Sequence, residues 1–391
     1  MKDWGREDER SKYRWVVLFA SFYAFIAFAF AFQEVPPLFD SIREAFGTTN
    51  FEAGLLMSVV LLPGIFLSLP AGLFVEKYGV RQIGFASLAC MSLGCFLTAT
   101  AGSFLVLLVG RLILGLAGTF IVTTTPAIIA QWFTKEELGK AMGIFGINMP
   151  FATVIAFPSA SALMLKYSWR LPLYIGLALG VTAAAVFVIV VKEGPFTKHK
   201  DNASIAQAVV NLEIWKVGFL WLFFNAAALS FTTWAPRLFR TFYEMSEIYA
   251  SFLASLLMWG AILFVPFFGW ISDRTGRRKP FAILGALLMA LVFVALGYAS
   301  NVTLIVLIFL LGFAAAMVPP IASALPAEIL GPTMASLGFG VTAMCMNLGA
   351  ASAQLLVGFI LDVTQSYTLS LLGMAGLSAV GMLVAYTLKT K

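Results

Sequence analysis

Two charged residues, Glu34 and Arg111, lie within long apolar stretches of this 391-residue sequence. A charge in the hydrocarbon of a membrane is costly, so it normally faces a partner or a water-filled cavity. Counted along helices, Glu34 lies roughly 9 Å and Arg111 roughly 12 Å from the same membrane surface. We therefore predict that they form an embedded couple, in which Glu34 binds and releases a proton as its surroundings change.

Each of these residues also has a plainer interpretation. Glu34 is compatible with a solvated position at the rim of the membrane, because hydropathy sets helix ends only to within several residues. Arg111 is compatible with a purely structural role between helices. The sequence leaves both alternatives open.

Uncharged amides form a second group of candidates. Asn148, Asn225 and Asn347 are expected roughly 15 to 21 Å from one membrane surface, in a hydrocarbon core of about 30 Å. Such amides can bind a solute, or they can bond between helices, which contributes about 0.6 kcal/mol on average. Gln354 and Gln33 are weaker candidates of the same kind.

The composition indicates the elements that position these residues. Hydrophobic residues make up 61% of the chain and charged residues only 11%, whereas soluble domains carry about 25% charged residues. The apolar runs are continuous and lack the alternation of a β-barrel, so we predict an all-α membrane protein with twelve transmembrane helices. The predicted spans cover residues 15–39, 51–75, 83–101, 103–131, 139–164, 170–191, 214–239, 247–272, 280–299, 302–325, 333–361 and 367–388.

The basic residues predict the orientation of these spans. Of the 25 Lys and Arg residues, 19 fall on the side of the termini, 5 on the opposite side and Arg111 within a span. This bias places both termini in the cytoplasm. We therefore ascribe the net charge of +6 to orientation in the cell membrane and not to binding of nucleic acid. We expect a monomer embedded in the lipid bilayer.

Three landmarks recur at about half the chain length. The loop G-L-F-V-E-K-Y-G-V-R at 72–81 is matched by G-W-I-S-D-R-T-G-R-R-K at 269–279. L-G-L-A-G at 114–118 is matched by L-G-F-A-A at 311–315, and P-L-F at 37–39 by P-R-L-F at 236–239. The repeats predict two pseudo-symmetric six-helix bundles, residues 1–191 and 214–391, joined by a polar cytoplasmic linker at 192–213.

At these residues the chain resembles the major facilitator superfamily of secondary transporters. The family's loop signature, G-x-L-a-D-r-x-G-r-k/r, is met in the second copy by Gly269, Asp273, Arg274, Gly276, Arg277 and Arg278. The first copy is looser, with Gly72, Glu76 in place of Asp, Lys77 in place of Arg, Val80 where a basic residue is usual, and Arg81.

Two further signatures of the family bear on helices 4 and 5. Arg111 followed by Gly115 meets the helix 4 signature, and the resemblance implies a role in proton coupling for this Arg and for an acid in helix 1. The Gly-Pro signature of helix 5 is poorly met by G-I-F-G-I-N-M-P at 143–150, which leaves the usual argument for an exporter unsupported.

The resemblance implies that the two repeated loops form a gate on the cytoplasmic side. Glycines permit close approach of a facing helix, and the acids can accept hydrogen bonds from a helix N-terminus or from Arg. The alternative is that the loops only anchor the topology through their positive charge. The predicted gating residues are Gly72, Glu76, Arg81, Gly269, Asp273, Arg274 and Arg277.

An enzymatic function is not supported by the residues. The one histidine, His199, lies in the linker, no His, Cys or Glu cluster has metal-ligand spacing, and no phosphate-binding G-x-x-x-x-G-K-[ST] loop is present. We therefore expect no catalytic residues, metal or cofactor. The duplicated half predicts a secondary active transporter that works by rocker-switch alternating access.

The substrate is predicted only by class. One embedded Arg, without a second basic residue in helices 8 or 11, favours a small monocarboxylate-like anion taken up with a proton by symport. The alternative is proton-coupled export of amphipathic or cationic compounds, with Glu34 as the acid and Phe side chains as apolar contacts. A non-transporting membrane sensor of the same fold is a remote third possibility.

Overall fold

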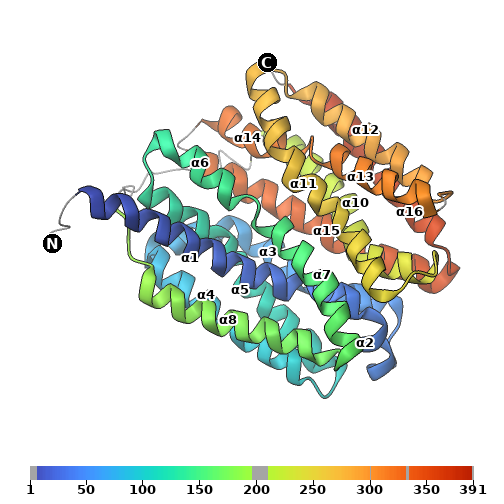
Figure 1. Cartoon of the computed structure of the whole chain (residues 1–391). Helices are drawn as coiled ribbons and strands as arrows, with labels where there is room; N and C mark the ends of the chain where they lie inside the picture. The colour runs from blue at the N-terminus through green and yellow to red at the C-terminus, as the bar shows by residue number, and fades with distance from the viewer. Residues whose placement is uncertain (1–6, 196–209, 300, 332–333, 390–391) are drawn as a thin grey trace.

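The computed structural model describes residues 7–195, 210–299, 301–331 and 334–389. Its described elements are helices, and twelve helical segments are long and apolar enough to cross a membrane, which confirms the predicted fold class. Both ends of the chain lie at the same end of the helices (Figure 1). We call this end the terminal side and the opposite end the far side.

The first six spans are built from eight α-helices and one short 3-10 helix. They are α1 (Glu7–Gln33), η1 (Pro36–Leu38), α2 (Phe39–Phe46), α3 (Asn50–Tyr78), α4 (Val80–Thr100), α5 (Phe104–Trp132), α6 (Lys135–Phe145), α7 (Asn148–Lys166) and α8 (Arg170–Val190). The last six spans comprise α10 (Leu212–Thr241), α11 (Glu247–Thr275), α12 (Lys279–Leu296), α13 (Asn301–Ala315), α14 (Pro319–Leu330), α15 (Ala335–Thr364) and α16 (Tyr367–Thr387).

Three predicted helices are interrupted, which corrects their continuous assignment. The span predicted at 15–39 ends as α1 at Gln33, passes through η1 and continues as α2 to Phe46. Pro36 and Pro37 cause this break, because proline has no N–H to continue the helical hydrogen bonds. The span at 302–325 breaks before Pro319 in the same way, whereas the span at 139–164 breaks between Phe145 and Asn148 without a proline at the break.

The helices pack in two groups, which we call the first half (α1 to α8) and the second half (α10 to α16). In the first group, α1 packs against α5, α7 and α8, and α4 packs against α5 and α8; in the second, α10 packs against α11, α15 and α16. The two groups meet chiefly along α3 with α15 and along α7 with α11. Residues 196–209, with His199, lie outside the described residues, and the domain boundaries at 191 and 214 remain a prediction.

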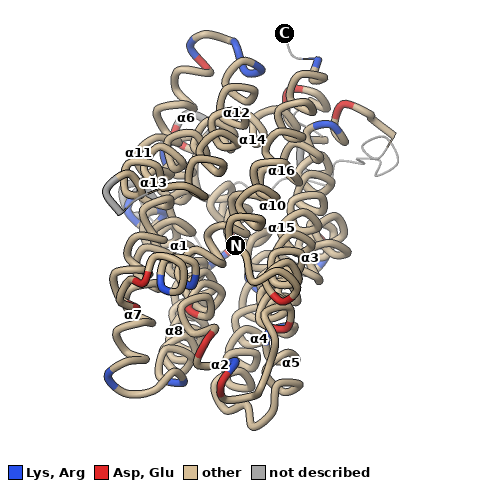
Figure 2. Tube along the Cα trace, turned by 90° about the vertical axis from the view of Figure 1, so that its right-hand side faces the viewer, with Lys and Arg blue, Asp and Glu red and all other residues tan. Residues whose placement is uncertain are grey.

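The surface fits a lipid environment along the length of the helices. Charged residues gather in loops and near helix ends, with long stretches free of charge between them (Figure 2). Large apolar side chains face outward, such as Phe66 (71% exposed), Leu105 (70%) and Ile189 (76%). Exposing so many large apolar side chains to water would be unfavourable. The outward Phe and Leu residues therefore indicate contact with the acyl chains of lipids.

Candidate functional site

Arg111 of α5 lies at the break in the first span. Its side chain is fully buried, and Nη1 donates to the carbonyl of Ala31 at 2.7 Å and Nη2 to that of Phe32 at 3.1 Å. The carbonyl of Phe32 is available because the residue four positions later, Pro36, has no N–H to donate to it. Arg111 Nε also donates to the carbonyl of Leu56 on α3 at 3.1 Å. The guanidinium therefore ties α1, α3 and α5 together through main-chain oxygens.

Glu34 and Arg111, the predicted couple, lie near enough for their charges to interact, but they form no direct ion pair in this conformation. Glu34 is buried, at 2% exposure, directly after the end of α1. Its Oε2 has no hydrogen-bond partner among the described residues, and no ion pair there joins it to Arg111. Its carboxyl group lies against Gly176 of α8, where an added Cβ would be 2.7 Å from Oε1. The solvated-rim interpretation of Glu34 is therefore wrong, and the bonds of Arg111 to carbonyls favour its structural interpretation.

Two glutamines beside this region are buried without partners. Gln33 ends α1 and Gln354 lies on α15, and both side chains are fully buried. The amide oxygen and nitrogen of each have no hydrogen-bond partner among the described residues. A buried amide without a partner costs about 1–3 kcal/mol. These amides are therefore free to bond to a solute, to water or to a rearranged neighbour.

Gln354 and Arg111 approach the same stretch of α3. The carbonyl of Gln354 would be 2.7 Å from a Cβ added at Gly54, and it accepts a hydrogen bond from Trp234 Nε1 at 3.3 Å. Arg111 bonds to Leu56, two residues further along α3. The buried polar groups of the two halves therefore meet α3 at nearly the same depth.

The three asparagines differ in what they bond to. Asn225 Nδ2 donates to the carbonyl of Trp221 in its own helix at 3.0 Å, and Asn148 Oδ1 accepts from the neighbouring N–H of Met149. Asn347 Nδ2 donates to Ala343 at 2.8 Å and lies 3.5 Å from Ser68 Oγ of the other half. Asn347 is the asparagine of the three that reaches across the two halves, and a solute-binding role for all three remains a prediction.

Contact between α3 and α15 runs from the far side toward the terminal side. Ser58 Oγ donates to the carbonyl of Ala351 at 2.7 Å, and a Cβ added at Gly340 would lie 2.8 Å from Leu69 Cδ1. At Gly72, one turn further along α3, an added Cβ would meet nothing within 4 Å. The two helices thus form a long seam, and Gly72 itself makes no close approach to a facing helix.

The predicted gating residues on the terminal side make contacts within their own halves. Arg81 Nη2 donates to the carbonyl of Val188 at 3.1 Å, and the Arg274 guanidinium lies 5.3 Å from the centre of the Trp270 ring. At Gly269 an added Cβ would make only an ordinary contact, 3.7 Å from Pro320. Close approach at Gly72 and Gly269 is therefore not seen in this conformation, and gating by these loops, including Glu76 and Arg277, remains a prediction.

Arg278 organises the second of these loops. Its guanidinium pairs with Glu328 and, at 3.1 Å, with Asp273. Burial disfavours its charged form, but the hydrogen bond and charge of Glu328, together with Asp273, raise the pKa of Arg278 above its ordinary value. The loop thus holds a permanent positive charge beside α14.

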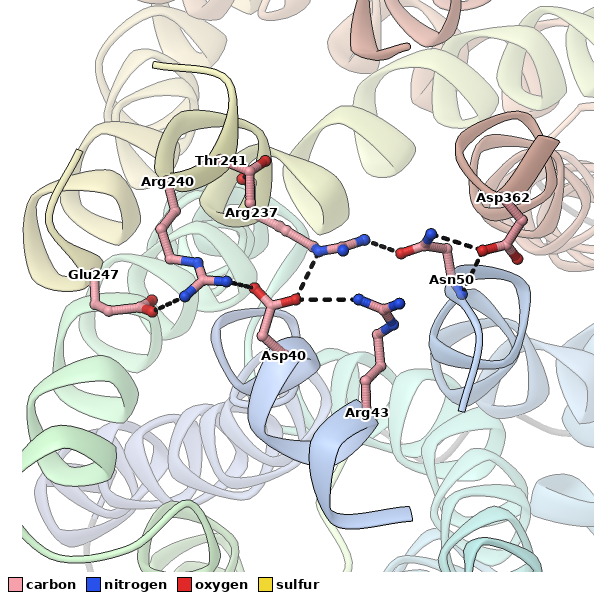
Figure 3. Close-up of polar contacts among 8 residues, drawn as sticks. All are labelled: Asp40, Arg43, Asn50, Arg237, Arg240, Thr241, Glu247 and Asp362. Carbon is pink, nitrogen blue, oxygen red and sulfur yellow. Dashed lines mark hydrogen bonds and ion pairs between the residues drawn. The ribbon is translucent and has the colours of Figure 1, made fainter. Parts of the chain in front are cut away.

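A polar cluster that was not predicted from the sequence joins the halves on the far side (Figure 3). Asp40 of α2 accepts from Arg237 Nε of α10 at 2.8 Å and also pairs with Arg240. Arg237 Nη1 donates in addition to Asn50 Oδ1 of α3. A signal for this cluster was present, because the repeated P-L-F ends are followed by Asp40 in one copy and by Arg240 in the other.

The same cluster continues at the start of α3. Asp362 of α15 accepts from the backbone N–H of Asn50 at 2.9 Å and from that of Phe51 at 2.7 Å. A carboxylate from one half therefore caps a helix N-terminus of the other, where the helix dipole favours negative charge. Within its own half, Thr49 and Glu52 form a capping box at the same helix start.

Among the described residues there is no group of three or more His, Cys, Asp or Glu that could hold a metal ion. The buried polar side chains of the described residues are amides, hydroxyls, one carboxyl and one guanidinium. They are suited to bind a solute and not to carry out covalent chemistry.

Comparisons with known proteins agree with this arrangement. Residues 15–250 and 241–391 match the family model described as Major Facilitator Superfamily. The chain is 25% identical over 254 residues to a probable nitrate/nitrite transporter, NarK2, of Mycobacterium tuberculosis, a match that spans 63% of this chain and 64% of that protein. It is 23% identical over 380 residues to a probable sulfoacetate transporter, SauU, of Cupriavidus necator, spanning 88% of this chain and 86% of that protein.

The fold itself is also found in a solved structure. The crystal structure of a point mutant of the nucleoside transporter NupG superposes with a TM-score of 0.80 at 15% identity, covering 95% of this chain and 99% of that one. At this identity the likeness concerns the fold alone. From the matched family model and the twelve spans, we conclude that the chain belongs to the major facilitator superfamily of secondary transporters.

Proposed function

We propose that this transporter moves a small organic anion, of the monocarboxylate type, together with a proton. The observation that carries the proposal is the group of buried polar side chains without partners, Gln33, Glu34 and Gln354, contributed by both halves. A solute held between the halves would satisfy these amides and would be exposed to one side at a time as the halves rock.

Glu34 is proposed as the proton carrier. A carboxylate buried without a hydrogen-bond partner is strongly disfavoured, so its neutral, protonated form suits this environment. When the halves part and water reaches the group, ionisation becomes favourable. The carboxyl group would therefore carry a proton in one direction of each cycle.

The anionic substrate class is supported by two independent points. The named relatives carry transporter names for nitrate, nitrite and sulfoacetate, which are small anions. Gln33 directly follows the two carbonyls that bind the buried Arg111, so an anion bonded to its amide nitrogen would lie in the field of that guanidinium. We propose one negative charge on the substrate, because Arg111 is the one basic residue far from the ends of a predicted span.

Proton-coupled uptake into proteoliposomes tests this proposal. Radiolabelled acetate and lactate should accumulate under an inward proton gradient, and Glu34→Gln should lower that accumulation by about tenfold or more because glutamine cannot carry a proton. Glu244→Gln, an exposed acid in a loop, is the matched control and should retain full accumulation. Full gradient-driven accumulation by Glu34→Gln would refute the coupling role.

The substrate contacts are tested by a second pair of variants. Gln354→Leu should raise the KM for the anion about tenfold, because leucine keeps the size of the side chain and removes its hydrogen bonds. Gln82→Leu, at an exposed position of α4, should leave KM unchanged. Drug-resistance profiling in the same host, with and without Glu34→Gln, tests the exporter alternative, which resistance without anion uptake would support.

The proposal includes the membrane, the orientation and the oligomeric state in which the transporter works. We propose that both termini face the cytoplasm of a cell whose plasma membrane holds the protein as a monomer, with the loops at 72–81 and 269–279 as the cytoplasmic gate. A thermal-shift screen against anions, sugars, amino acids and drugs gives the substrate class directly, since a ligand that binds the folded protein raises its Tm.

A further inference from the structure

We propose that the far side carries a second binding site for a small anion, in the hollow where Arg43, Arg237 and Arg240 converge on Asp40. This inference rests on the proposed transport of anions but concerns a different place from the buried glutamines. An anion bound there competes with Asp40 for the arginines, and so loosens the contact between the halves.

The hollow has the size and the lining of a ligand site. Its volume is about 370 Å³, and it is bordered by Asp40, Arg43, Glu44, Gly47, Thr48, Arg237 and Arg240. Pockets for small ligands measure about 300–1,000 Å³. Residues of α2 and the loop after it form one wall and the end of α10 forms the other, so the hollow lies between the two halves.

The charges around the hollow leave the arginines short of carboxylates. Asp40 accepts from Arg237 at 2.8 Å, from Arg43 at 3.4 Å and from Arg240, so one carboxylate serves three guanidinium groups (Figure 3). Glu247, at 2.7 Å, is the further carboxylate that pairs with Arg240. Glu44 borders the hollow but is exposed, and no ion pair joins it to a described residue. Three cations therefore face two paired anions.

Several donors at the hollow have no partner. The Nε atoms of Arg43 and Arg240 and the hydroxyl of Thr48 are buried, and none has a hydrogen-bond partner among the described residues. The N–H groups of a guanidinium are arranged as a fork that matches two oxygens of a carboxylate or another oxyanion. A small oxyanion that displaces Asp40 from the arginines would supply acceptors for these donors.

Binding there has a direct consequence for the conformation. Asp40 belongs to the first half, whereas Arg237 and Arg240 belong to the second, so their ion pairs hold the far side closed. An anion that binds these arginines in place of Asp40 removes the ion pairs between the halves. A ligand shifts a conformational equilibrium by its difference in affinity for the two states, and this anion favours the state with the far side open.

Distance measurements between spin labels test the coupling. Lys166→Cys and Tyr298→Cys place labels on exposed far-side positions, one in each half. Sodium acetate or sodium nitrate should lengthen the distance between the labels, and Asp40→Asn should lengthen it without added anion. An equal response to sodium chloride at the same ionic strength would mean charge screening alone and would overturn the proposal, as would no response to any of the salts.

Calorimetric titration of purified protein with sodium acetate distinguishes binding of the anion in the hollow from opening of the far side. Arg43 bonds to Asp40 of its own half, so Arg43→Gln leaves the bonds between the halves in place. This variant should lower the affinity for acetate about tenfold or more, the effect of losing one charged hydrogen bond, with an unchanged label distance in the absence of acetate. Arg170→Gln, which removes a far-side cation that bonds to the carbonyls of Ala99 and Ala101 away from the hollow, should change neither quantity.

The same titration distinguishes this inference from the proposed transport site. Acetate binding that survives Gln354→Leu and weakens in Arg43→Gln supports the far-side site, whatever the transport assays show. Binding that is lost in Gln354→Leu and retains full affinity in Arg43→Gln would place the anion at the glutamines and overturn the far-side site. Asp40→Asn should raise the affinity, because it removes the competing carboxylate, and a lower affinity would also contradict the proposal.

Discussion

The two ends of the molecule use their charges in opposite ways. On the far side, Asp40 pairs with Arg237 and Arg240 across the halves, and Asp362 of one half caps α3 of the other. On the terminal side, the ion pairs of the described residues stay within one half, as for Arg14 with Glu137 and Arg278 with Glu328. Among residues 7–195, 210–299, 301–331 and 334–389, the ion pairs that join the halves lie on the far side, so this conformation is closed toward the far side.

This difference also indicates which ion pairs can persist while the halves move. An ion pair inside one half can persist while the halves move, whereas a pair between the halves must break when the far side opens. The Arg278 loop can therefore keep its contacts throughout a cycle, and the Asp40 cluster cannot. Substitutions at the far side, in the middle of the seam and on the terminal side should therefore differ in how strongly they affect the contact between the halves.

Loss of Arg237 should have the largest effect. Arg237→Gln removes the ion pair to Asp40 and weakens the bond to Asn50, both of which join the halves. Each hydrogen bond to a charged group contributes about 1.5–3 kcal/mol, so the population with an open far side should rise about tenfold or more. The distance distribution between labels at positions 166 and 298 measures this population.

A matched arginine serves as the control for this prediction. Arg170 also lies on the far side, but it donates to the carbonyls of Ala99 and Ala101 in its own half. Arg170→Gln should leave the label distances unchanged. If both variants opened the far side equally, the bonds between the halves would not be what closes it.

An intermediate effect is expected at Gly64, in the middle of the seam. A Cβ at this position would lie 2.6 Å from Nδ2 and 2.8 Å from Cγ of Asn347. Gly64→Ala should therefore destabilise the closed seam by about 1–3 kcal/mol, the usual cost of overpacking, and lower the Tm. Asn347→Ala in the same protein should recover most of the loss, because it makes room for the added methyl group.

Gly72 is the control on the same helix. An alanine there meets nothing within 4 Å in this conformation, and alanine favours a helix over glycine by about 0.5–1 kcal/mol. Gly72→Ala should leave the Tm equal or slightly higher. A marked loss of Tm would show that the halves touch at Gly72 in the resting protein. Slower transport at an unchanged Tm would instead support the predicted gating role, in which Gly72 meets its partner only in the opposite state.

The smallest effect is expected from Arg278. Its partners Asp273 and Glu328 are 68% and 49% exposed, and all three residues lie in the same half. Partly exposed ion pairs contribute about 0–1 kcal/mol, so Arg278→Gln should change the Tm little and leave the far-side label distance as it was. A lengthened far-side distance would show that the two ends are coupled through the second half.

The sequence predicted the general arrangement because it depends on composition and on repeats. Twelve apolar runs and the matched loops at 72–81 and 269–279 were sufficient for fold and family. Helix breaks were harder to predict, because Pro63 and Pro70 lie within an unbroken α3, whereas Pro36 and Pro37 end α1. Whether a proline breaks a membrane helix depends on what satisfies the freed carbonyls nearby.

The hydrogen bonds of the candidate site were still harder to predict from the sequence than the helix breaks. Burial of Glu34 and Arg111 could be predicted from their apolar surroundings, but their bonding could not. Depth along a helix says nothing about rotation around its axis, and the prediction treated side chains as the natural partners of Arg111. The carbonyls of Ala31 and Phe32 lie in the last turn of α1 and are available because the helix ends at Gln33, which hydropathy does not reveal.

The same guanidinium constrains how the first half can move. Because Arg111 holds main-chain oxygens of α1 and α3 from its place on α5, these three helices cannot slide past one another without abandoning a buried charge. Main-chain oxygens are present whatever side chains occupy positions 31, 32 and 56. Substitutions at these three positions should therefore preserve the hydrogen bonds, whereas substitution of Arg111 removes them. Movement is thereby left to the boundary with the second half, and residues 31–34 travel with the first half as one piece.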